Sequence, residues 1–165
     1  MKRSVIGLAL ALGLAGMAQA AEPWRISPEG VGPVRVGMST KQAMAVLRPA
    51  PDATGIGDPK TCEEYATGGA HHINFMIQEN RVTRVSAGDG VATPEGVKVG
   101  DPVAAVHKAY PTLEKDDAPY GEPPAHDLYW WQTPTNGLRF EIDERGRVAA
   151  IHGGDESIRY MEGCL

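Results

Sequence analysis

Alternating apolar and polar positions predict β-strands in two separate parts of the chain. Residues 73–77 and 138–142 both place apolar side chains at every second position, a period that turns one side of a strand inward. A turn and a returning strand follow each segment. In the returning strands the apolar residues Val85 and Ile151 come three positions after the preceding apolar residue instead of two. This shared slip predicts a β-bulge in both places. We expect one more edge strand at 158–161.

Two stretches carry the same motif and predict a tandem repeat. Residues 34–43 and 97–106 both begin with a Val-basic-Val-Gly core and lead into a helix start. Self-similarity of this kind indicates repeated structural units. We therefore divide the chain into repeats at about 27–90 and 93–164. Gly37 and Gly100 are expected in equivalent turns that need positive φ or close packing.

Each motif leads into a short helix. Ser39 stands three residues before Gln42, which predicts a capping box. Asp101 is expected as the second N-cap, with Pro102 at the first helical position. Helices of about nine residues are unstable alone in water, so both should pack on one face of a shared sheet. The predicted fold class is α+β: two tandem helix-plus-antiparallel-meander repeats in one two-layer domain, with the other sheet face open.

The N-terminus has the pattern of a secretory signal peptide. Residues 1–20 contain Lys2-Arg3, an apolar stretch and an Ala-x-Ala ending. The apolar stretch is shorter than the roughly 20 residues of a membrane span, although an uncleaved anchor is the alternative. We expect a periplasmic or secreted monomer in which residues 21–165 form a single domain without a membrane span.

The chain contains two cysteines, Cys62 and Cys164. In an exported protein, two cysteines predict one disulfide. This bond would join the first repeat to the end of the second. Zinc is the weaker alternative, because neither cysteine has a Cys-x-x-Cys or Cys-x-x-His neighbour.

The charge balance and the missing motifs exclude several classes of function. The formal net charge is −5 and no basic block occurs, which argues against nucleic acid and anionic membranes as partners. The histidines lack metal-ligand spacing, and there is no Gly-x-Ser-x-Gly nucleophile motif. We therefore expect no enzyme activity, no cofactor and no metal.

An aromatic run supplies the candidate binding face, which consists of Tyr129, Trp130 and Trp131. Side chains alternate along a strand, so Leu128 and Trp130 face one way and Tyr129 and Trp131 face the other. One of these pairs should pack under the helices. The other pair would lie on the open sheet face, where aromatic side chains are typical interface anchors. The alternative is that loops such as 119–124 fold over the run and bury it.

The motif and the strand pattern resemble a known group of folds. The Val-x-Val-Gly turn before a helix and the Phe-x-Ile/Glu-x-x-Arg-Val hairpin are similar to the tandem-repeat fold of secreted β-lactamase inhibitor proteins (BLIP). They also resemble the related SmpA/OmlA (BamE) outer-membrane lipoproteins, although this chain lacks a lipidated cysteine. The ending from Tyr160 to Cys164 resembles that of a group of exported proteobacterial proteins.

The resemblance implies a function without catalysis. We expect a secreted or periplasmic protein-binding module, inhibitor-like or immunity-like, that uses the open face of its sheet. Its partner would be another envelope or secreted protein. The alternative is a periplasmic protein that binds a small ligand or a glycan fragment on the same aromatic residues.

Overall fold

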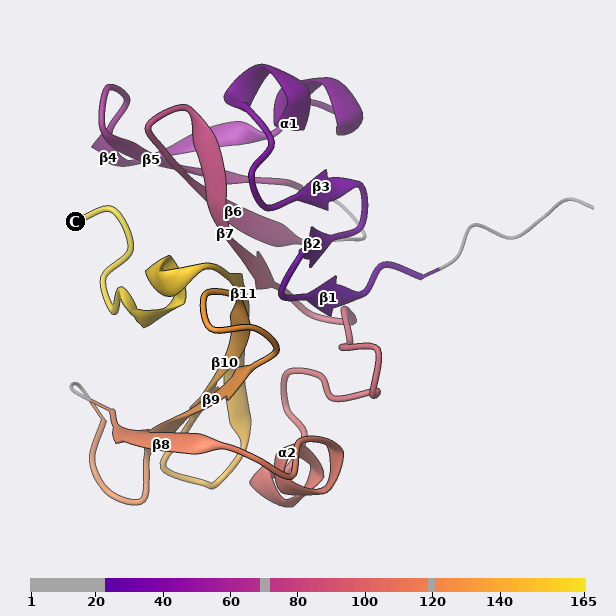
Figure 1. Cartoon of the computed structure of the whole chain (residues 1–165), viewed down its shortest axis with the longest axis vertical. Coiled ribbons are helices and arrows are strands. Elements are labelled where there is room, and N and C mark those ends of the chain that lie inside the picture. Colours follow the sequence, from indigo (N-terminus) through magenta and orange to yellow (C-terminus); the bar gives the residue numbers. More distant parts are fainter. Residues whose placement is uncertain (1–22, 69–71, 119–120) are drawn as a thin grey trace, which may run out of the picture.

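The computed structural model describes residues 23–68, 72–118 and 121–165, and an antiparallel sheet of eight strands runs through it (Figure 1). Its strand order is β4-β5-β6-β7-β11-β10-β9-β8. The strands are β4 (Asp52–Asp58), β5 (Cys62–Ala66), β6 (Ile73–Gln78), β7 (Arg81–Ala87), β8 (Glu114–Asp117), β9 (His126–Trp131), β10 (Gly137–Ile142) and β11 (Val148–Gly154).

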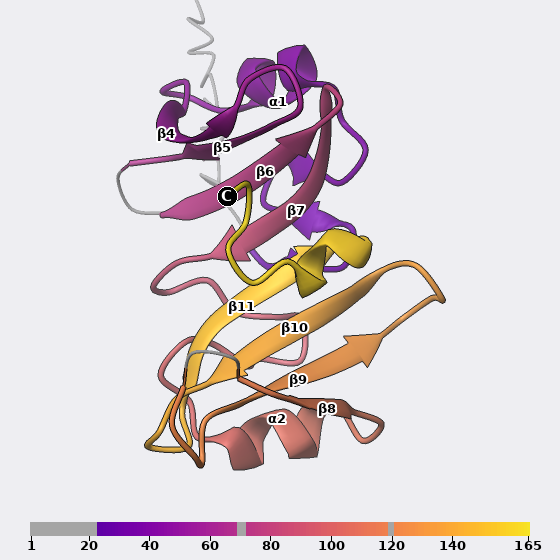
Figure 2. The same ribbon diagram turned by 90° about the vertical axis from the view of Figure 1, so that its left-hand side faces the viewer.

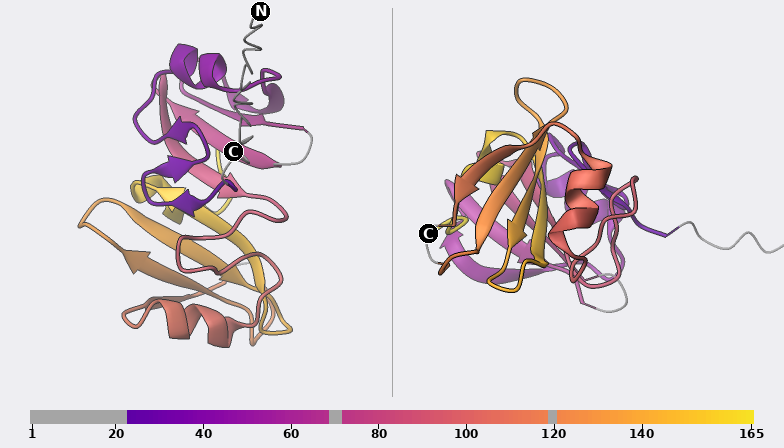
Figure 3. Two further views of the ribbon diagram at one scale, coloured as in Figure 1. Left: turned by 90° about the vertical axis from the view of Figure 1, so that its right-hand side faces the viewer. Right: turned by 90° about the horizontal axis from the view of Figure 1, so that it is seen from below.

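A second, three-stranded sheet and two short helices complete the regular structure. The small sheet contains β1 (Ile26–Ser27), β2 (Gly30–Val31) and β3 (Val34–Arg35). The helices are α1 (Thr40–Val46) and α2 (Val103–Ala109). Figure 3 shows the small sheet between the two helices, on one side of the large sheet.

The α+β class predicted from the sequence is wrong, because the fold is mainly β. Each helix has seven residues and buries a single one of them, Ala43 in α1 and Val106 in α2. Two such helices cannot form a layer of their own. The small sheet covers the part of the large sheet that lies between them. The description as helix-plus-meander repeats in two layers is therefore replaced by two packed antiparallel sheets with helices at the margin. The signal peptide predicted at 1–20 lies outside the described residues.

Alternation along the strands gives the large sheet two different faces. The apolar face carries fully buried side chains such as Phe75, Phe140 and Ile151, which pack under the small sheet and the helices. The polar face carries the alternate residues of the same strands, among them Arg84 and Arg139. Register shifts at Met76/Ile77 and at Glu141/Ile142 confirm the two predicted irregularities in the hairpins.

The two glycine turns have the same geometry. Gly37 has φ 87° and Gly100 has φ 89°, values at which side chains with a Cβ are strained. The Gly37 N–H donates to Val82 O at 2.7 Å, and the Gly100 N–H donates to Val148 O at 2.8 Å. Both turns thus attach the chain ahead of a helix to the returning strand of a hairpin.

The helix starts differ from one another. Ser39 and Gln42 form the predicted capping box in α1. In α2 the N-cap is Pro102, which offers no side-chain hydrogen bond, so the prediction of Asp101 at this position is wrong. The Asp101 carboxylate instead accepts the Lys98 N–H at 3.0 Å and closes the preceding turn.

The C-terminal segment crosses the polar face of the large sheet (Figure 2). It begins with the 3₁₀-helix η1 (Glu156–Arg159) and continues to Cys164; we call residues 155–164 the tail. The predicted edge strand at 158–161 is therefore wrong. Asp155 caps η1 by accepting the Ser157 N–H at 2.9 Å, which favours a helical turn over an extended strand. The polar face is consequently covered at its centre.

Candidate functional site

The structure places two of the three predicted aromatic residues under the tail. Tyr129 is 2% exposed and its ring is stacked with that of Trp131, with centroids 6.2 Å apart. The Arg159 guanidinium lies 4.8 Å from the Tyr129 centroid and 5.0 Å from the Trp131 centroid, in cation–π range. Glu114 holds this arrangement by accepting hydrogen bonds from Arg159 and Trp131, which also lower the pKa of Glu114.

The third aromatic residue, Trp130, lies on the apolar face. Its ring centroid is 5.0 Å from that of Tyr110, which in turn contacts Phe140 at 5.1 Å. Tyr129, Trp130 and Trp131 therefore split between two faces, and each face is covered by another part of the chain. They do not form an exposed patch.

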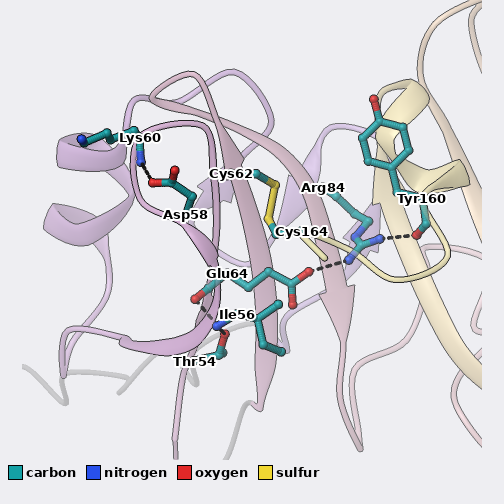
Figure 4. Close-up of a disulfide and its surroundings, with 9 residues drawn as sticks. All are labelled: Thr54, Ile56, Asp58, Lys60, Cys62, Glu64, Arg84, Tyr160 and Cys164. Atoms are coloured by element: carbon teal, nitrogen blue, oxygen red, sulfur yellow. Dashed lines mark hydrogen bonds and ion pairs between the residues drawn. A yellow bond between two sulfur atoms is a disulfide. The ribbon is translucent and has the colours of Figure 1, made fainter.

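The predicted disulfide is confirmed and fixes the end of the tail. Cys62 in β5 and Cys164 are bonded, with Cα atoms 5.4 Å apart and a sequence separation of 102 (Figure 4). Arg84 lies between this bond and η1, where it donates to Tyr160 O at 2.8 Å and to Glu64 Oε1 at 3.0 Å. A covalent bond and a buried guanidinium thus hold the tail on the sheet.

Beneath the tail lies a network of buried charged side chains. Arg139 is 2% exposed, and its Nη2 lies 3.1 Å from Asp127 Oδ2 and 2.9 Å from Glu141 Oε1. Its Nη1 donates to Ile158 O at 3.2 Å. Asp127 is also 2% exposed, and its Oδ2 has no hydrogen bond within the described chain, since the contact with Arg139 is an ion pair without hydrogen-bond geometry.

The network continues through His152 to the neighbouring strand β7. His152 Nε2 lies 2.9 Å from Glu141 Oε1, and Ser86 Oγ lies 2.7 Å from His152 Nδ1. An ionised carboxylate only accepts, so we assign the proton to Nε2, which donates to Glu141. Nδ1 then accepts the Ser86 hydroxyl. Burial lowers the pKa of His152 although the Glu141 bond opposes it, so the imidazole is neutral at neutral pH.

The pKa values of the two carboxylates in the network, Asp127 and Glu141, are shifted in opposite directions. Burial raises the pKa of Asp127, and the attraction of Arg139 offsets this only in part. Burial would also raise the pKa of Glu141, but the His152 hydrogen bond and the positive charges around it prevail and lower that pKa. Asp127 is thus the less well compensated of the two acids.

A cavity of about 380 Å³ opens beside this network, between β9, β10 and the tail; we call it the β10 cavity. Its polar lining includes Asp127, Arg139 and Glu141. Its apolar walls come from the connection before β9, from β10 and β11, and from the tail: Ala118, Ala125, Ile142, Ala149 and Met161. Concave, mostly apolar cavities with a few polar groups are typical ligand sites.

Sequence reasoning missed this cavity, although a signal for it exists. Asp127 and Tyr129 on β9 pair with Glu141 and Arg139 on β10. Charged residues at alternate positions of two neighbouring strands share one face, but the pattern alone predicts that this face meets solvent. The buried position follows from the tail, which comes from a distant part of the sequence.

Neither a metal centre nor a membrane helix is found in the described ranges 23–68, 72–118 and 121–165. No group of three or more His, Cys, Asp or Glu side chains there could hold a metal ion. No helix in those ranges is both long and apolar enough to cross a membrane.

Comparison with known proteins gives a likeness in fold. No protein-family model and no curated protein matches the chain. A similar solved structure is an extracellular protein containing an SCP domain from Bacillus anthracis, with a TM-score of 0.51 and 11% sequence identity. The match covers 73% of this chain and 44% of that protein, so the chain spans less than half of its length. The disulfide is consistent with secretion, because such bonds persist in oxidising compartments.

Proposed function

We propose that this protein is an exported, non-catalytic ligand-binding protein whose site is the β10 cavity. The proposal rests on the buried charged residues that line this cavity, where Arg139 is shared between Asp127 and Glu141. Buried ion pairs add little net stability compared with apolar residues, which leaves a binding role as the reason to place one beside a cavity.

The proposal departs from the role expected from the sequence. Protein binding through Tyr129, Trp130 and Trp131 stays a prediction, but Arg159 of the tail lies over Tyr129 and Trp131, and Trp130 packs against Tyr110. A glycan stacked on the same rings has no support either, since none of the three lines the β10 cavity. The ligand we infer is a small polar molecule.

A serine, a histidine and a glutamate beside the cavity resemble a catalytic triad, but their placement does not favour catalysis. Ser86, His152 and Glu141 are connected in the order found in serine hydrolases. The β10 cavity is lined by Glu141 but not by Ser86, so the hydroxyl would not face a ligand bound there. We assign Ser86 and His152 the role of orienting Glu141.

Periplasmic or extracellular location belongs to the proposal as well. It is supported by the leader-like pattern of residues 1–20 and by the disulfide, which persists in oxidising compartments. A reducing cytosol would leave the tail without its covalent anchor.

The test is a ligand screen with a matched pair of variants. A library of small amines, carboxylates and neutral amides is screened by two-dimensional NMR against the disulfide-bonded protein. Ala149→Trp places an indole at the exposed edge of the cavity, and Ala104→Trp places one on the exposed face of α2, away from it.

We expect compounds that bind the unmodified protein and Ala104→Trp but not Ala149→Trp. The proposed site would be contradicted if compounds bind the Ala149→Trp variant as well as they bind the unmodified protein, or if no compound of the library binds. Thermal unfolding of both variants checks that neither tryptophan disrupts the fold.

A further inference from the structure

The guanidinium of the β10 cavity has little capacity left for an anion. Arg139 Nη1 donates to Ile158 O and Tyr160 O, and Nη2 faces both Asp127 and Glu141. Its Nε is buried without a partner in the described chain and carries a single N–H. An anionic ligand would find only this buried Nε–H free, and it could pair with the two Nη groups only by displacing a carboxylate or the tail.

The carboxylates, in contrast, exceed the cations. The cavity is lined by four acidic side chains, which are Asp127, Glu141, Asp143 and Glu144, and by two basic ones, Arg139 and Arg145. Arg145 is exposed on the β10–β11 turn, so the interior has one cation for two carboxylates. Asp116 on β8 pairs with Asp127 and adds a further negative charge nearby.

Asp127 is the focus of this imbalance. Its side chain is almost wholly buried, lines the cavity and has a carboxylate oxygen without a hydrogen bond. A buried carboxylate with only a shared ion pair is under-compensated, and a positive group in the cavity would stabilise it. The raised pKa of Asp127 agrees with this picture.

We propose that the ligand of the β10 cavity is a small organic cation, an amine or guanidinium on a short aliphatic body. The inference rests on the proposed function and names its ligand class. The cation pairs with Asp127 and Glu141, while the aliphatic part packs against Ile142, Met161 and the alanines of the wall. The volume of about 380 Å³ is at the small end of the ligand-site range of roughly 300–1,000 Å³.

The test compares three probes that share a branched aliphatic body and differ in head group: isopentylamine, isopentanol and isovalerate. Each is titrated into the disulfide-bonded protein while the amide resonances of β9, β10 and the 143–145 turn are followed by NMR. We expect saturable shifts with the amine, weaker ones with the alcohol and none with the carboxylate. Added salt should weaken the binding of the amine and leave that of the alcohol unchanged, because only the amine binds through an ionic interaction.

Two variants remove one negative charge each, and a third serves as the control. Asp127→Asn or Glu141→Gln should weaken the binding of isopentylamine by at least about tenfold, since each removes a charged acceptor for the cation. Asp89→Asn, on an exposed loop outside the cavity lining, should leave the affinity unchanged. Glu141→Gln keeps the test decisive if Asp127→Asn unfolds.

The outcomes separate the inference from the proposed function. If isovalerate or isopentanol binds the cavity as well as the amine does, or if none of the three binds, the cationic ligand class is wrong. The proposed function stands in that case if an anionic or neutral compound of the library binds and is blocked by Ala149→Trp. It fails with the inference if no compound of any charge binds there.

Discussion

The two faces of the eight-stranded sheet are built from alternate residues of the same strands, yet they bury opposite chemistry. On β10, Phe140 is fully buried in the apolar core, whereas the adjacent Arg139 is 2% exposed on the polar face. The apolar face gains free energy from burial at about 25 cal/mol per Å². The polar face buries charges that desolvation makes costly. The comparison indicates that the first face stabilises the fold and that the second positions the cavity and the tail.

The largest effect is expected on the apolar face. Phe140→Ala should lower the free energy of unfolding by about 3–5 kcal/mol, because it removes a fully buried ring and leaves a cavity. Urea denaturation followed by circular dichroism measures the loss. Val46→Ala, at a 40% exposed position in α1, is the control and should cost under about 1 kcal/mol. Equal losses at both positions would contradict the assignment of the core.

The second prediction concerns a broken ion pair on the polar face. Arg139→Met should also cost about 3–5 kcal/mol, because it leaves Asp127 as an uncompensated buried charge. The combined variant Asp127→Asn, Arg139→Met and Glu141→Gln removes every charge of the triad and should regain most of that loss. Recovery of stability would show that the two faces differ, because the loss caused by Phe140→Ala comes from a cavity and cannot be recovered by removing charges. A triple variant as unstable as the single one would show that the polar face itself stabilises the fold.

The third prediction removes the covalent anchor of the tail. Replacing Cys62 and Cys164 by Ser should cost about 2–4 kcal/mol, because the bond closes a long loop in the unfolded chain. The measurement is urea denaturation of the variant beside the parent protein with and without reductant. Reductant should lower the midpoint of the parent to that of the variant. If the bond is reduced and the midpoint of the parent stays unchanged, non-covalent contacts such as those of Arg84, Arg139 and Arg159 hold the tail.

The apolar face was predictable from the sequence because its signal is local. Alternation of apolar residues along 73–77 and 138–142 identified the strands, and Ser39 with Gln42 identified the start of α1. The fold class was missed because the helices are too short to form a layer. The two-residue strands β1 and β2 were also missed, since they lie in a lead-in rich in proline and glycine without a periodic pattern.

The polar face was not predictable for a related reason. Arg139 and Glu141 occupy positions that alternation assigns to solvent, and nothing in their neighbourhood in the sequence shows that the tail crosses them. The cysteines revealed that the C-terminus is tied to the first half of the chain, which is a long-range signal. They do not specify the path of the tail, which depends on buried guanidinium groups binding its carbonyls.

The fourth prediction concerns the two glycine turns that attach the helices to the apolar side. Gly37→Val and Gly100→Val should each cost about 1–3 kcal/mol, because valine is strained at positive φ. A Cβ added at either glycine would meet no atom within 4 Å, so the cost is conformational rather than steric. Gly68→Val is the control, with similar open space and no positive φ. The three variants are compared by thermal unfolding. A loss of stability in Gly68→Val equal to that in the other two would rule out strain at positive φ as the cause.

The smallest effect is a dependence on pH that arises on the polar face alone. Burial lowers the pKa of His152 in the folded protein, whereas the unfolded chain takes up a proton near pH 6.5. The unfolded state therefore binds more protons below pH 6.5, and the stability that neutral His152 contributes is lost as the pH falls. One proton gives a slope of at most about 1.4 kcal/mol per pH unit. His152→Gln should flatten the stability profile just below pH 6.5, before Asp127 and Glu141 contribute, and His107→Gln on the exposed side of α2 should not. Urea denaturation at a series of pH values measures both profiles, and identical slopes for the parent and His152→Gln would place the pH sensitivity outside this network.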